Sequence, residues 1–289
     1  MIKAYFRLVR PFTSFPPILA VVLGSVAGAL YTGSTIDITV LIVAVISMTS
    51  AQIFGQITNQ LADPPELDRI NNKYRVLVTN EIDRDIAWYL AGIFLMISLF
   101  SASLVNRIYL IIILFLLLCT YLYNFEPVRL KKRFLLNNLI LGISRGFVPV
   151  IATWSVFSPI VTETYYYAFG LFIWVFGWQT TKDIPDTKGD REFGIRTIPV
   201  VLGKEGAIRF ISWITWVFWI YHLLLTYVTH DIGYSLIGTT VFVLGLFGLR
   251  NIEKRTNIEN TFGWIAFYLG IVVYYLMMLM IVISRTTIF

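Results

Sequence analysis

The 289 residues are 57% hydrophobic and only 14% charged, with a mean hydropathy of +0.74. Soluble domains carry about 45–50% apolar residues, so this composition excludes an ordinary soluble domain and predicts a protein that crosses the membrane several times. The net charge of +6 could indicate nucleic acid as a partner. In membrane proteins, however, excess Lys and Arg gathers in cytoplasmic loops, so the distribution of the charges decides between the two interpretations.

The basic and then apolar N-terminus is interpreted as a retained first span, because about 20 apolar residues follow without a small-residue cleavage site. The single cysteine, Cys119, lies within an apolar run. It can therefore form no intrachain disulfide, and a paired-thiol metal site is excluded.

Nine apolar runs are long enough to cross a bilayer, which takes roughly 17–25 helical residues. They predict an all-α bundle of nine transmembrane helices around a central cavity, at about 13–32, 38–61, 86–105, 107–124, 136–157, 164–182, 207–228, 233–250 and 261–284. With the N-terminus in the cytoplasm, nearly all of the 23 Lys and Arg residues fall on one side, Arg107 and Arg285 fall on the other, and Arg145 lies within the fifth run. This asymmetry predicts that orientation and argues against nucleic acid as a partner.

The first dense group of polar residues follows the second run, in the stretch NQLADPPELDRINNKYR at 59–75. Asn59 and Asp63 are four residues apart, so on a helix they share one face. The two prolines that follow predict that the helix ends at Asp63 and that Glu66 and Asp68 lie on a loop.

A second group follows the sixth run, in DIPDTKGDREFGIR at 183–196. Its three aspartates, Asp183, Asp186 and Asp190, are spaced by three and four residues, which places them on one helical face. Four runs separate the two groups, and because four is even, both face the cytoplasm in parallel halves. We therefore predict a single domain over 1–289, with two pseudo-repeats at about 1–125 and 126–250 and a ninth helix.

Carboxylates that share a face at a membrane edge repel one another unless a cation neutralises them. Oxygen ligands favour a hard ion such as Mg²⁺, which proteins hold through one or two carboxylates together with substrate phosphates. Basic residues beside the acids could donate charge-assisted hydrogen bonds to a diphosphate. The alternative is a solvated surface on which acids and bases neutralise one another, which two groups at matching positions disfavour.

Three stretches in this order, NQLADPPELDRIN, YNFEPVRLKKR at 123–133 and KDIPDTKGDREFGIRTIPVVLG at 182–203, resemble the UbiA superfamily of intramembrane prenyltransferases. The resemblance covers nearly the whole chain. It implies a Mg²⁺-dependent transfer of a polyprenyl group from an allylic diphosphate to a lipophilic acceptor within the membrane. The acceptor would be an aromatic quinone precursor or an isoprenoid lipid.

The resemblance also implies roles for individual residues. The implied metal ligands are Asn59, Asp63, Asp68, Asp183, Asp186 and Asp190, and all of them except Asp183 also count as catalytic. The implied diphosphate-binding residues are Lys73, Arg75, Tyr123, Asn124, Arg129, Lys131, Lys182 and Arg196.

Two departures from the superfamily pattern stand in the first group. Gln60 occupies a position where an acid is usual, which we interpret as the loss of one negative charge from the site. Asp63 and Asp68 are five residues apart where four is usual, and this spacing leaves Glu66 as an alternative to Asp68 in the first metal site.

An allylic carbocation needs a dry cavity lined by aromatic rings. Trp174 and Trp178 lie on a run that leads to the second group, although packing is the commoner role for aromatic residues in membrane spans. Arg145 should face the bundle interior, either to contact substrate or to form a pair between helices.

A multi-pass cation transporter or exchanger is the competing interpretation. Transporters place ionisable ligands near the middle of the bilayer, in broken helices of inverted repeats. Here the acids lie at the ends of runs in parallel halves, with basic residues beside them, which favours a phosphate substrate over a bare cation.

Overall fold

The computed structural model describes residues 2–72, 75–256 and 261–286. Within these ranges the chain is helical, apart from its turns and an isolated antiparallel bridge between Arg255 and Thr261. The predicted all-α fold is confirmed.

Eight helices of the described chain are long and apolar enough to cross a membrane. They are α2 (Pro11–Thr32), α3 (Ile38–Ala62), α5 (Arg84–Val105), α6 (Arg107–Asn124), a composite helix (Leu136–Trp154), α11 (Ile198–Thr229), α12 (Ile232–Arg250) and α13 (Phe262–Thr286). The sixth predicted run corresponds to α9 (Thr162–Trp178), which has 17 residues and continues as a 3₁₀ turn, η3 (Gln179–Lys182). The nine predicted runs thus correspond to these eight helices and the shorter α9.

Shorter elements complete the chain. The composite helix consists of α7 (Leu136–Leu141), a π-helical turn η2 (Gly142–Phe147) and α8 (Val148–Trp154). Outside the spans lie α1 (Ile2–Val9), α4 (Pro65–Asn72), the 3₁₀ turn η1 (Leu130–Lys132) and α10 (Thr187–Glu192).

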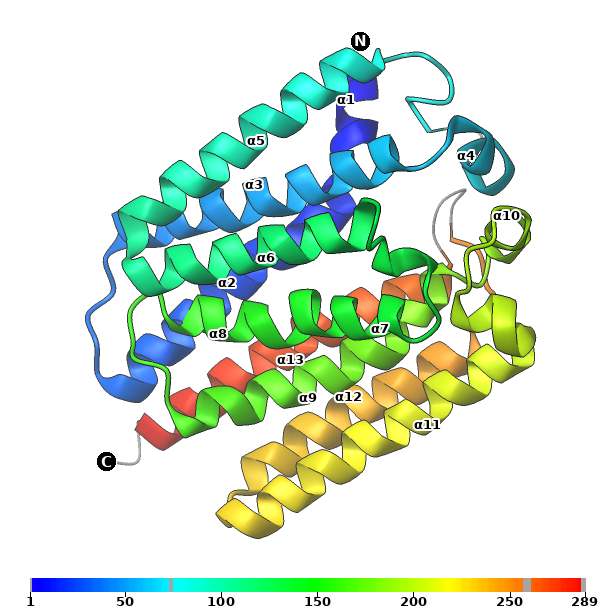
Figure 1. Cartoon of the computed structure of the whole chain (residues 1–289). Helices are drawn as coiled ribbons and strands as arrows, with labels where there is room; N and C mark the ends of the chain where they lie inside the picture. The colour runs from blue at the N-terminus through cyan, green and yellow to red at the C-terminus, as the bar shows by residue number, and fades with distance from the viewer. Residues whose placement is uncertain (1, 73–74, 257–260, 287–289) are drawn as a thin grey trace.

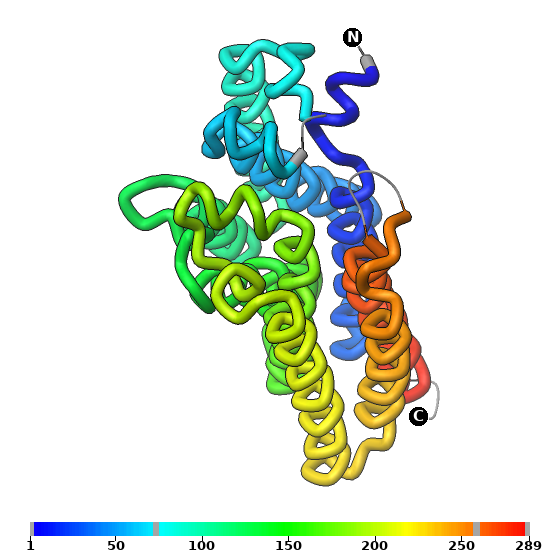
Figure 2. The backbone as a smooth tube through the Cα atoms, turned by 90° about the vertical axis from the view of Figure 1, so that its right-hand side faces the viewer, coloured from blue at the N-terminus to red at the C-terminus, as the bar shows by residue number. Residues whose placement is uncertain are grey.

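The long helices run side by side, and the two ends of the chain lie at opposite ends of the bundle (Figure 1). The helix α3 packs on α5, α2 packs on α13, and α9 packs against η2. The pair α11 and α12 forms a hairpin whose tip reaches farthest from the N-terminus (Figure 2). The short helices α4 and α10 contact each other at one end of the bundle, so the two polar groups of the sequence meet there.

Buried tryptophans fix the position of α9. Trp174 and Trp178 are fully buried, and their indole N–H groups donate to the Phe267 carbonyl and the Thr215 hydroxyl, each at 3.1 Å. A Cβ atom on Gly270 would lie 2.2 Å from Trp174, so α13 can approach this ring only through a glycine. The packing role predicted for aromatic residues of this run is therefore confirmed for both tryptophans.

The helix α3 ends at Ala62, one residue before the predicted end at Asp63, but Glu66 and Asp68 do not lie on a loop. Pro65 begins the short helix α4, which carries both acids. Proline is favourable at the first position of a helix, because the N–H that it lacks has no partner there in any case. The loop prediction treated the two prolines only as helix breakers.

The second group also differs from its prediction, which placed its three aspartates on one helical face. Asp183 follows η3, Asp186 precedes α10, and only Asp190 lies within α10. The chain turns between the first two, so no single helix carries all three. They nevertheless line one cavity.

Candidate active site

A polar cavity of about 170 Å³ lies at the end of the bundle where α4 meets α10. Carboxylates from both groups line it: Asp63, Asp68, Asp183, Asp186 and Asp190. Cationic side chains line it as well: Arg10, Arg75, Lys131, Arg145, Lys182 and Arg255. The cavity therefore brings together acids and bases that stand far apart in the sequence.

The first group holds its carboxylates in ion pairs. The Oδ1 atom of Asp63 lies 2.7 Å from Lys131 Nζ and 3.2 Å from Arg129 Nη2, and Arg75 pairs with Asp68. Burial alone would raise the pKa of Asp63, but the charges of Lys131, Arg75 and Arg129 outweigh burial and hold that pKa below its ordinary value. Asp63 is therefore ionised and already neutralised by the protein.

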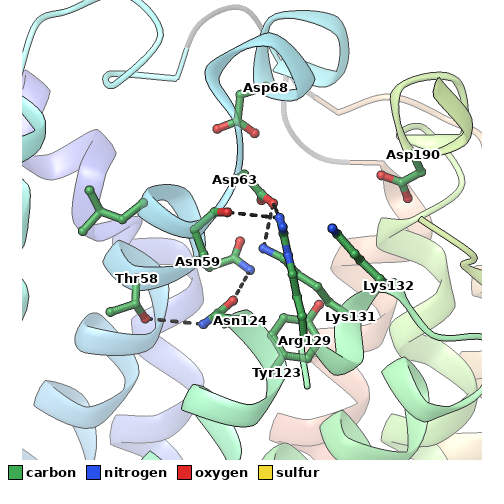
Figure 3. A network of polar contacts seen from close by, with 12 residues as sticks. Thr58, Asn59, Asp63, Asp68, Tyr123, Asn124, Arg129, Lys131, Lys132 and Asp190 are labelled. Carbon is green, nitrogen blue, oxygen red and sulfur yellow. Dashed lines mark hydrogen bonds and ion pairs between the residues drawn. The ribbon is translucent and has the colours of Figure 1, made fainter. Parts of the chain in front are cut away.

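A chain of hydrogen bonds orients Asn59 (Figure 3). The Thr58 hydroxyl donates to the Phe54 carbonyl at 2.8 Å, so it can accept from Asn124 Nδ2 at 3.4 Å. Asn124 then presents Oδ1 to Asn59, whose Nδ2 donates to it at 2.9 Å. With its amide nitrogen engaged in this way, Asn59 turns Oδ1 towards Asp63, the orientation that a metal ligand requires.

Arg129 reaches Asp63 from an unusual backbone conformation. Its φ of 35° and ψ of 63° lie in the left-handed region, which a residue other than glycine occupies at a cost of about 1–3 kcal/mol. Its Nη2 also donates to the Ala62 carbonyl at 3.0 Å, so the side chain closes over the end of α3. Backbone strain and side-chain contacts thus occur together beside the cavity.

In the second group, Asp183 is the carboxylate with the most partners. Its Oδ1 lies 3.1 Å from Lys182 Nζ, and its Oδ2 accepts from Asn137 Nδ2 at 3.0 Å. Lys182 also donates to the Tyr123 hydroxyl at 2.9 Å. This set links the second group to α6 and α7.

The other two aspartates of the second group have no cationic partner among the described residues. Asp190 accepts from the neutral groups of Asn71 and Thr197, each at 3.3 Å, and no described residue forms an ion pair with Asp186. Burial raises the pKa of Asp186 to about 6. Burial, with the charges of Asp183 and Asp186, raises the pKa of Asp190 to about 8.

Asn71 joins the two groups across the cavity. A Cβ atom on Gly189 would lie 2.1 Å from Asn71 Oδ1, so α10 approaches α4 closely only because residue 189 is glycine. The hydrogen bond from Asn71 to Asp190 uses this close approach.

Most of the predicted site residues gather here. Ten line the polar cavity: Asn59, Asp63, Asp68, Arg75, Tyr123, Lys131, Lys182, Asp183, Asp186 and Asp190. Arg129 contacts Asp63, and Asn124 lines a neighbouring chamber. Arg196 is exposed and lies outside the cavity lining, and Lys73 lies outside the described residues.

Of the two candidates for the first metal site, Asp68 lies in the cavity and is only 3% exposed, whereas Glu66 is exposed to solvent. Gln60 corrects a further expectation. Its Nε2 donates to the Leu8 carbonyl at 2.9 Å, and the buried side chain faces α1 and does not line the cavity. An acid at residue 60 would therefore not have contributed a charge to the cavity.

Several cavity residues were not predicted, namely Arg10, Asn71, Asn137, Thr197 and Arg255. Asn71 stands three residues after Asp68 on α4, so helical spacing could have identified it. Asn137 is a polar residue inside an apolar run, which in a membrane helix marks a contact or a site. Arg10, Thr197 and Arg255 left no such signal.

An apolar chamber of about 120 Å³ adjoins the polar cavity. The two share Thr13, Asn59, Tyr123 and Arg145 as a common wall. Apolar and aromatic side chains form much of the remaining lining, among them Met48, Ala51, Leu116, Cys119, Phe267, Tyr268, Ile271 and Tyr275. A molecule with a charged head and an apolar tail could therefore occupy both spaces at once.

The donor set suits Mg²⁺ in its chemistry, because it consists of carboxylate and amide oxygens. Within the described ranges, no three His, Cys, Asp or Glu side chains converge closely enough to enclose an ion by themselves. This arrangement agrees with the way proteins bind Mg²⁺, through few ligands of their own and the remainder from water and phosphate.

Known proteins share the sequence and the fold. The model of the UbiA prenyltransferase family matches residues 18–271. A digeranylgeranylglyceryl phosphate synthase of Methanobrevibacter smithii is 28% identical, over 87% of this chain and 89% of its own length. A 4-hydroxybenzoate octaprenyltransferase of Francisella tularensis is 25% identical, over 90% of both chains. The bacteriochlorophyll synthase 33 kDa chain of Cereibacter sphaeroides is 26% identical, over 86% of this chain and 82% of its own.

Solved structures agree on the fold. A UbiA homologue of Archaeoglobus fulgidus bound to GPP and Mg²⁺ superposes with a TM-score of 0.74 at 19% identity, covering 96% of this chain and 99% of that one. A digeranylgeranylglyceryl phosphate synthase structure gives 0.66 at 21% identity, covering 100% and 99%. These matches favour a transferase over a cation transporter. Because the family model covers most of its length, the chain belongs to the UbiA prenyltransferase family.

Proposed function

We propose that the polar cavity binds the Mg²⁺-complexed diphosphate of an allylic donor and that the apolar chamber receives its prenyl chain. A UbiA prenyltransferase transfers such a chain to a lipophilic acceptor within the membrane. The observation that supports this assignment is the common wall of the two spaces, where Asn59 and Tyr123 stand between carboxylates on one side and apolar side chains on the other.

The residues that would hold Mg²⁺ are Asn59, Asp63 and Asp68 from the first group and Asp183, Asp186 and Asp190 from the second. Bound Mg²⁺ supplies the positive charge that stabilises the diphosphate as the allylic C–O bond breaks. Asp186 and Asp190 are the acids best placed to gain from it, because no described cation pairs with them.

Cationic and phenolic groups bind the diphosphate oxygens in this proposal. Arg75, Lys131 and Lys182 line the cavity and donate charge-assisted hydrogen bonds. The Tyr123 hydroxyl accepts from Lys182 at 2.9 Å, so it keeps its own proton to donate towards the leaving group. Arg129 acts indirectly, because its guanidinium holds Asp63 at the end of α3.

The apolar chamber excludes water from the developing allylic cation. Tyr268, Tyr275 and Phe267 bring aromatic rings to its lining, and ring faces attract cations. Water would otherwise capture the cation and turn transfer into hydrolysis.

The enzyme is an integral membrane protein with several spans, and we propose that its N-terminus and active-site loops face the cytoplasm. The asymmetric distribution of Lys and Arg supports this orientation. We propose in addition that 1–289 form one domain of two parallel halves, about 1–125 and 126–250, with α13 as the ninth helix. The meeting of α4 and α10 at one end of the bundle supports this arrangement.

The test is a transfer assay on the purified chain in lipid nanodiscs, with radiolabelled geranylgeranyl diphosphate, Mg²⁺ and an extract of native lipids. We expect a labelled lipid product that disappears in EDTA and returns with added Mg²⁺. Full activity in chelator would contradict the metal assignment. Recovery of the label only in free prenyl alcohol, with no labelled lipid product, would contradict transfer to an acceptor.

A further inference from the structure

Arg145 stands inside a membrane-spanning helix. It lies near the middle of the 19-residue composite helix Leu136–Trp154, roughly 14 Å along the helix axis from Leu136. The π-helical turn η2 carries it. Such turns are rare within α-helices and occur frequently at functional sites.

The backbone around Arg145 is held firmly against α9. A Cβ atom on Gly146 would lie 2.8 Å from the Leu171 carbonyl oxygen, and one on Gly142 would lie 2.9 Å from the Phe172 ring. Two glycines thus bring the π-helical turn into contact with α9, which fixes the point from which the arginine side chain extends.

The hydrogen-bond partner of Arg145 is neutral. Its Nη1 donates to Gln179 Oε1 at 3.3 Å, and no described carboxylate forms an ion pair with it. The charge of Asp183 does act on Arg145, but both Asp183 oxygens are engaged by Lys182 and Asn137. An arginine is always charged and carries five N–H donors, so most of its binding capacity is uncommitted.

Arg145 also belongs to the wall that the polar cavity shares with the apolar chamber. Asp63, Asp68 and Asp183 have cations of their own in Lys131, Arg75 and Lys182. None of these three ion pairs involves the positive charge of Arg145. The Arg145 side chain also lines the apolar chamber.

We propose that Arg145 binds an anionic head group, a phosphate monoester or a carboxylate, on the lipophilic acceptor and thereby selects the acceptors that react. This inference rests on the proposed function. A planar guanidinium holds an oxyanion through two parallel hydrogen bonds, which fixes direction as well as position. The reacting end of the acceptor is then held beside the common wall, where the donor places its reactive carbon, while the prenyl chain of the donor occupies the chamber.

The experiment compares acceptors that differ only in this charge. One pair is a prenylglycerol phosphate and its dephosphorylated alcohol, and the other is 4-hydroxybenzoate and its methyl ester. Calorimetry on the full chain in nanodiscs, without donor, measures binding, and the transfer assay gives KM for acceptor and donor. The wild type should bind the anionic member of one pair at least about tenfold more tightly than the neutral member. The pair that shows this preference identifies the head group.

Arg145→Gln should remove that preference, and it should raise KM for the anionic acceptor about tenfold or more while leaving KM for the donor within about twofold. Arg145→Lys keeps the charge and should recover part of the preference. Arg107→Gln is the matched control and should change neither constant. It removes an exposed arginine at the start of α6, whereas Tyr123 of the cavity lies at the other end of that helix.

Gln179→Glu separates binding from a structural role. The new carboxylate would neutralise Arg145 without removing it, so anionic acceptors should bind as weakly as in Arg145→Gln. If Arg145 served only to join η2 to η3, the stronger pair would preserve acceptor binding and raise the Tm.

Three results would overturn the inference. The wild type could bind neither anionic probe more tightly than its neutral counterpart. Arg145→Gln could raise KM for the donor and spare the acceptor, which would assign the arginine to the donor diphosphate. Gln179→Glu could leave acceptor binding intact. In each case Mg²⁺-dependent transfer would persist, whereas failure of the proposed function would abolish transfer to every acceptor.

Discussion

The two groups of acidic residues line one cavity, but their carboxylates differ in the partners that neutralise them. In the first, Asp63 lies 2.7 Å from Lys131 and 3.2 Å from Arg129, and Asp68 pairs with Arg75. In the second, Asp190 has only neutral partners, and Asp186 forms no ion pair among the described residues.

Ionisation follows this difference. Cations lower the pKa of Asp63 in spite of its burial, while burial raises the pKa of Asp186 to about 6 and, with two neighbouring carboxylates, that of Asp190 to about 8. Asp63 is neutralised by the protein itself, and Asp183 of the second group has Lys182 as its partner. Asp186 and Asp190 are left for a cation from solution. Superficially similar acidic motifs can therefore differ in what they require from a ligand.

Replacing one acid in each group should give the largest effect. We expect Asp63→Asn and Asp186→Asn each to lower turnover more than about 1,000-fold, a loss of about 4 kcal/mol of transition-state stabilisation. Their stabilities should diverge. Asp63→Asn leaves Lys131 and Arg129 without their counter-charge and should cost about 3–5 kcal/mol of unfolding free energy. Asp186→Asn removes a repelling charge and should leave the Tm unchanged or higher.

Transfer assays and thermal melts in detergent measure these two quantities side by side. Equal losses of stability in both variants would show that the two groups are electrostatically alike. Activity within about tenfold of wild type in either variant would remove that acid from the metal site.

The orientation of Asn59 provides a smaller test, confined to the first group. Asn124→Leu removes the acceptor that engages Asn59 Nδ2, so the amide can rotate and Oδ1 loses its fixed direction. Partners of this kind typically contribute 10–100-fold to metal affinity, and we expect a loss in about that range. Thr58→Ser keeps the hydroxyl and serves as the control. Titration with Mn²⁺, followed by electron paramagnetic resonance, reports the affinity, and an unchanged affinity would contradict the orienting role.

A change of pH near neutrality should act through Asp190. Mg²⁺ binds a deprotonated carboxylate, and a pKa of about 8 means that Asp190 is mostly protonated at neutral pH before the metal binds. Mg²⁺ affinity should therefore rise between pH 6 and pH 8, by at most about tenfold per unit. In Asp190→Asn this component of the slope should vanish, although a contribution from Asp186 below about pH 6 should remain. A flat profile in the wild type would show that Asp190 is ionised without the metal.

The smallest effect on metal binding is expected at Gln60. Because its side chain donates to the Leu8 carbonyl and faces away from the cavity, Gln60→Asp should leave Mg²⁺ affinity within about twofold. It should lower the unfolding free energy by about 1–3 kcal/mol, since it places an acid beside carbonyl oxygens. Gln60→Leu removes the amide donor without adding a charge, and it is the comparison variant for stability. A marked gain in Mg²⁺ affinity would show that residue 60 reaches the cavity.

The sequence was sufficient to predict the helices and to place the acidic residues at helix ends, because apolar runs and helical spacing are local properties. Gln60 could have been placed correctly by the same reasoning: if Asn59 and Asp63 share a face, residue 60 is turned by about 100° from it. Asp68 reaches the cavity despite its wider spacing because α4 turns the chain after Pro65. That turn depends on Pro65 as the first residue of a helix, whereas the sequence pattern suggested only that the prolines end one.

Other features depended on contacts between distant segments. Arg10 lies between α1 and α2, and the other unpredicted or unassigned lining residues come from α4, α7 and η2, namely Asn71, Asn137 and Arg145. Local patterns can mark single residues of this set, but none indicates that all four line one cavity. Arg196 illustrates the opposite error, because a basic residue near the motif is not thereby in the site. Gly194 has a φ of +67°, and beyond this turn the Arg196 side chain is exposed.

The common wall of the two spaces, formed by Thr13, Asn59, Tyr123 and Arg145, also bears on the direction of the reaction. One product, inorganic diphosphate, dissolves in water, and the other, a prenylated lipid, dissolves in the bilayer. Reversal would require both to return to opposite sides of that wall at the same moment. We therefore expect the partition of products between two solvents, more than the strength of the bond formed, to keep net flux forward.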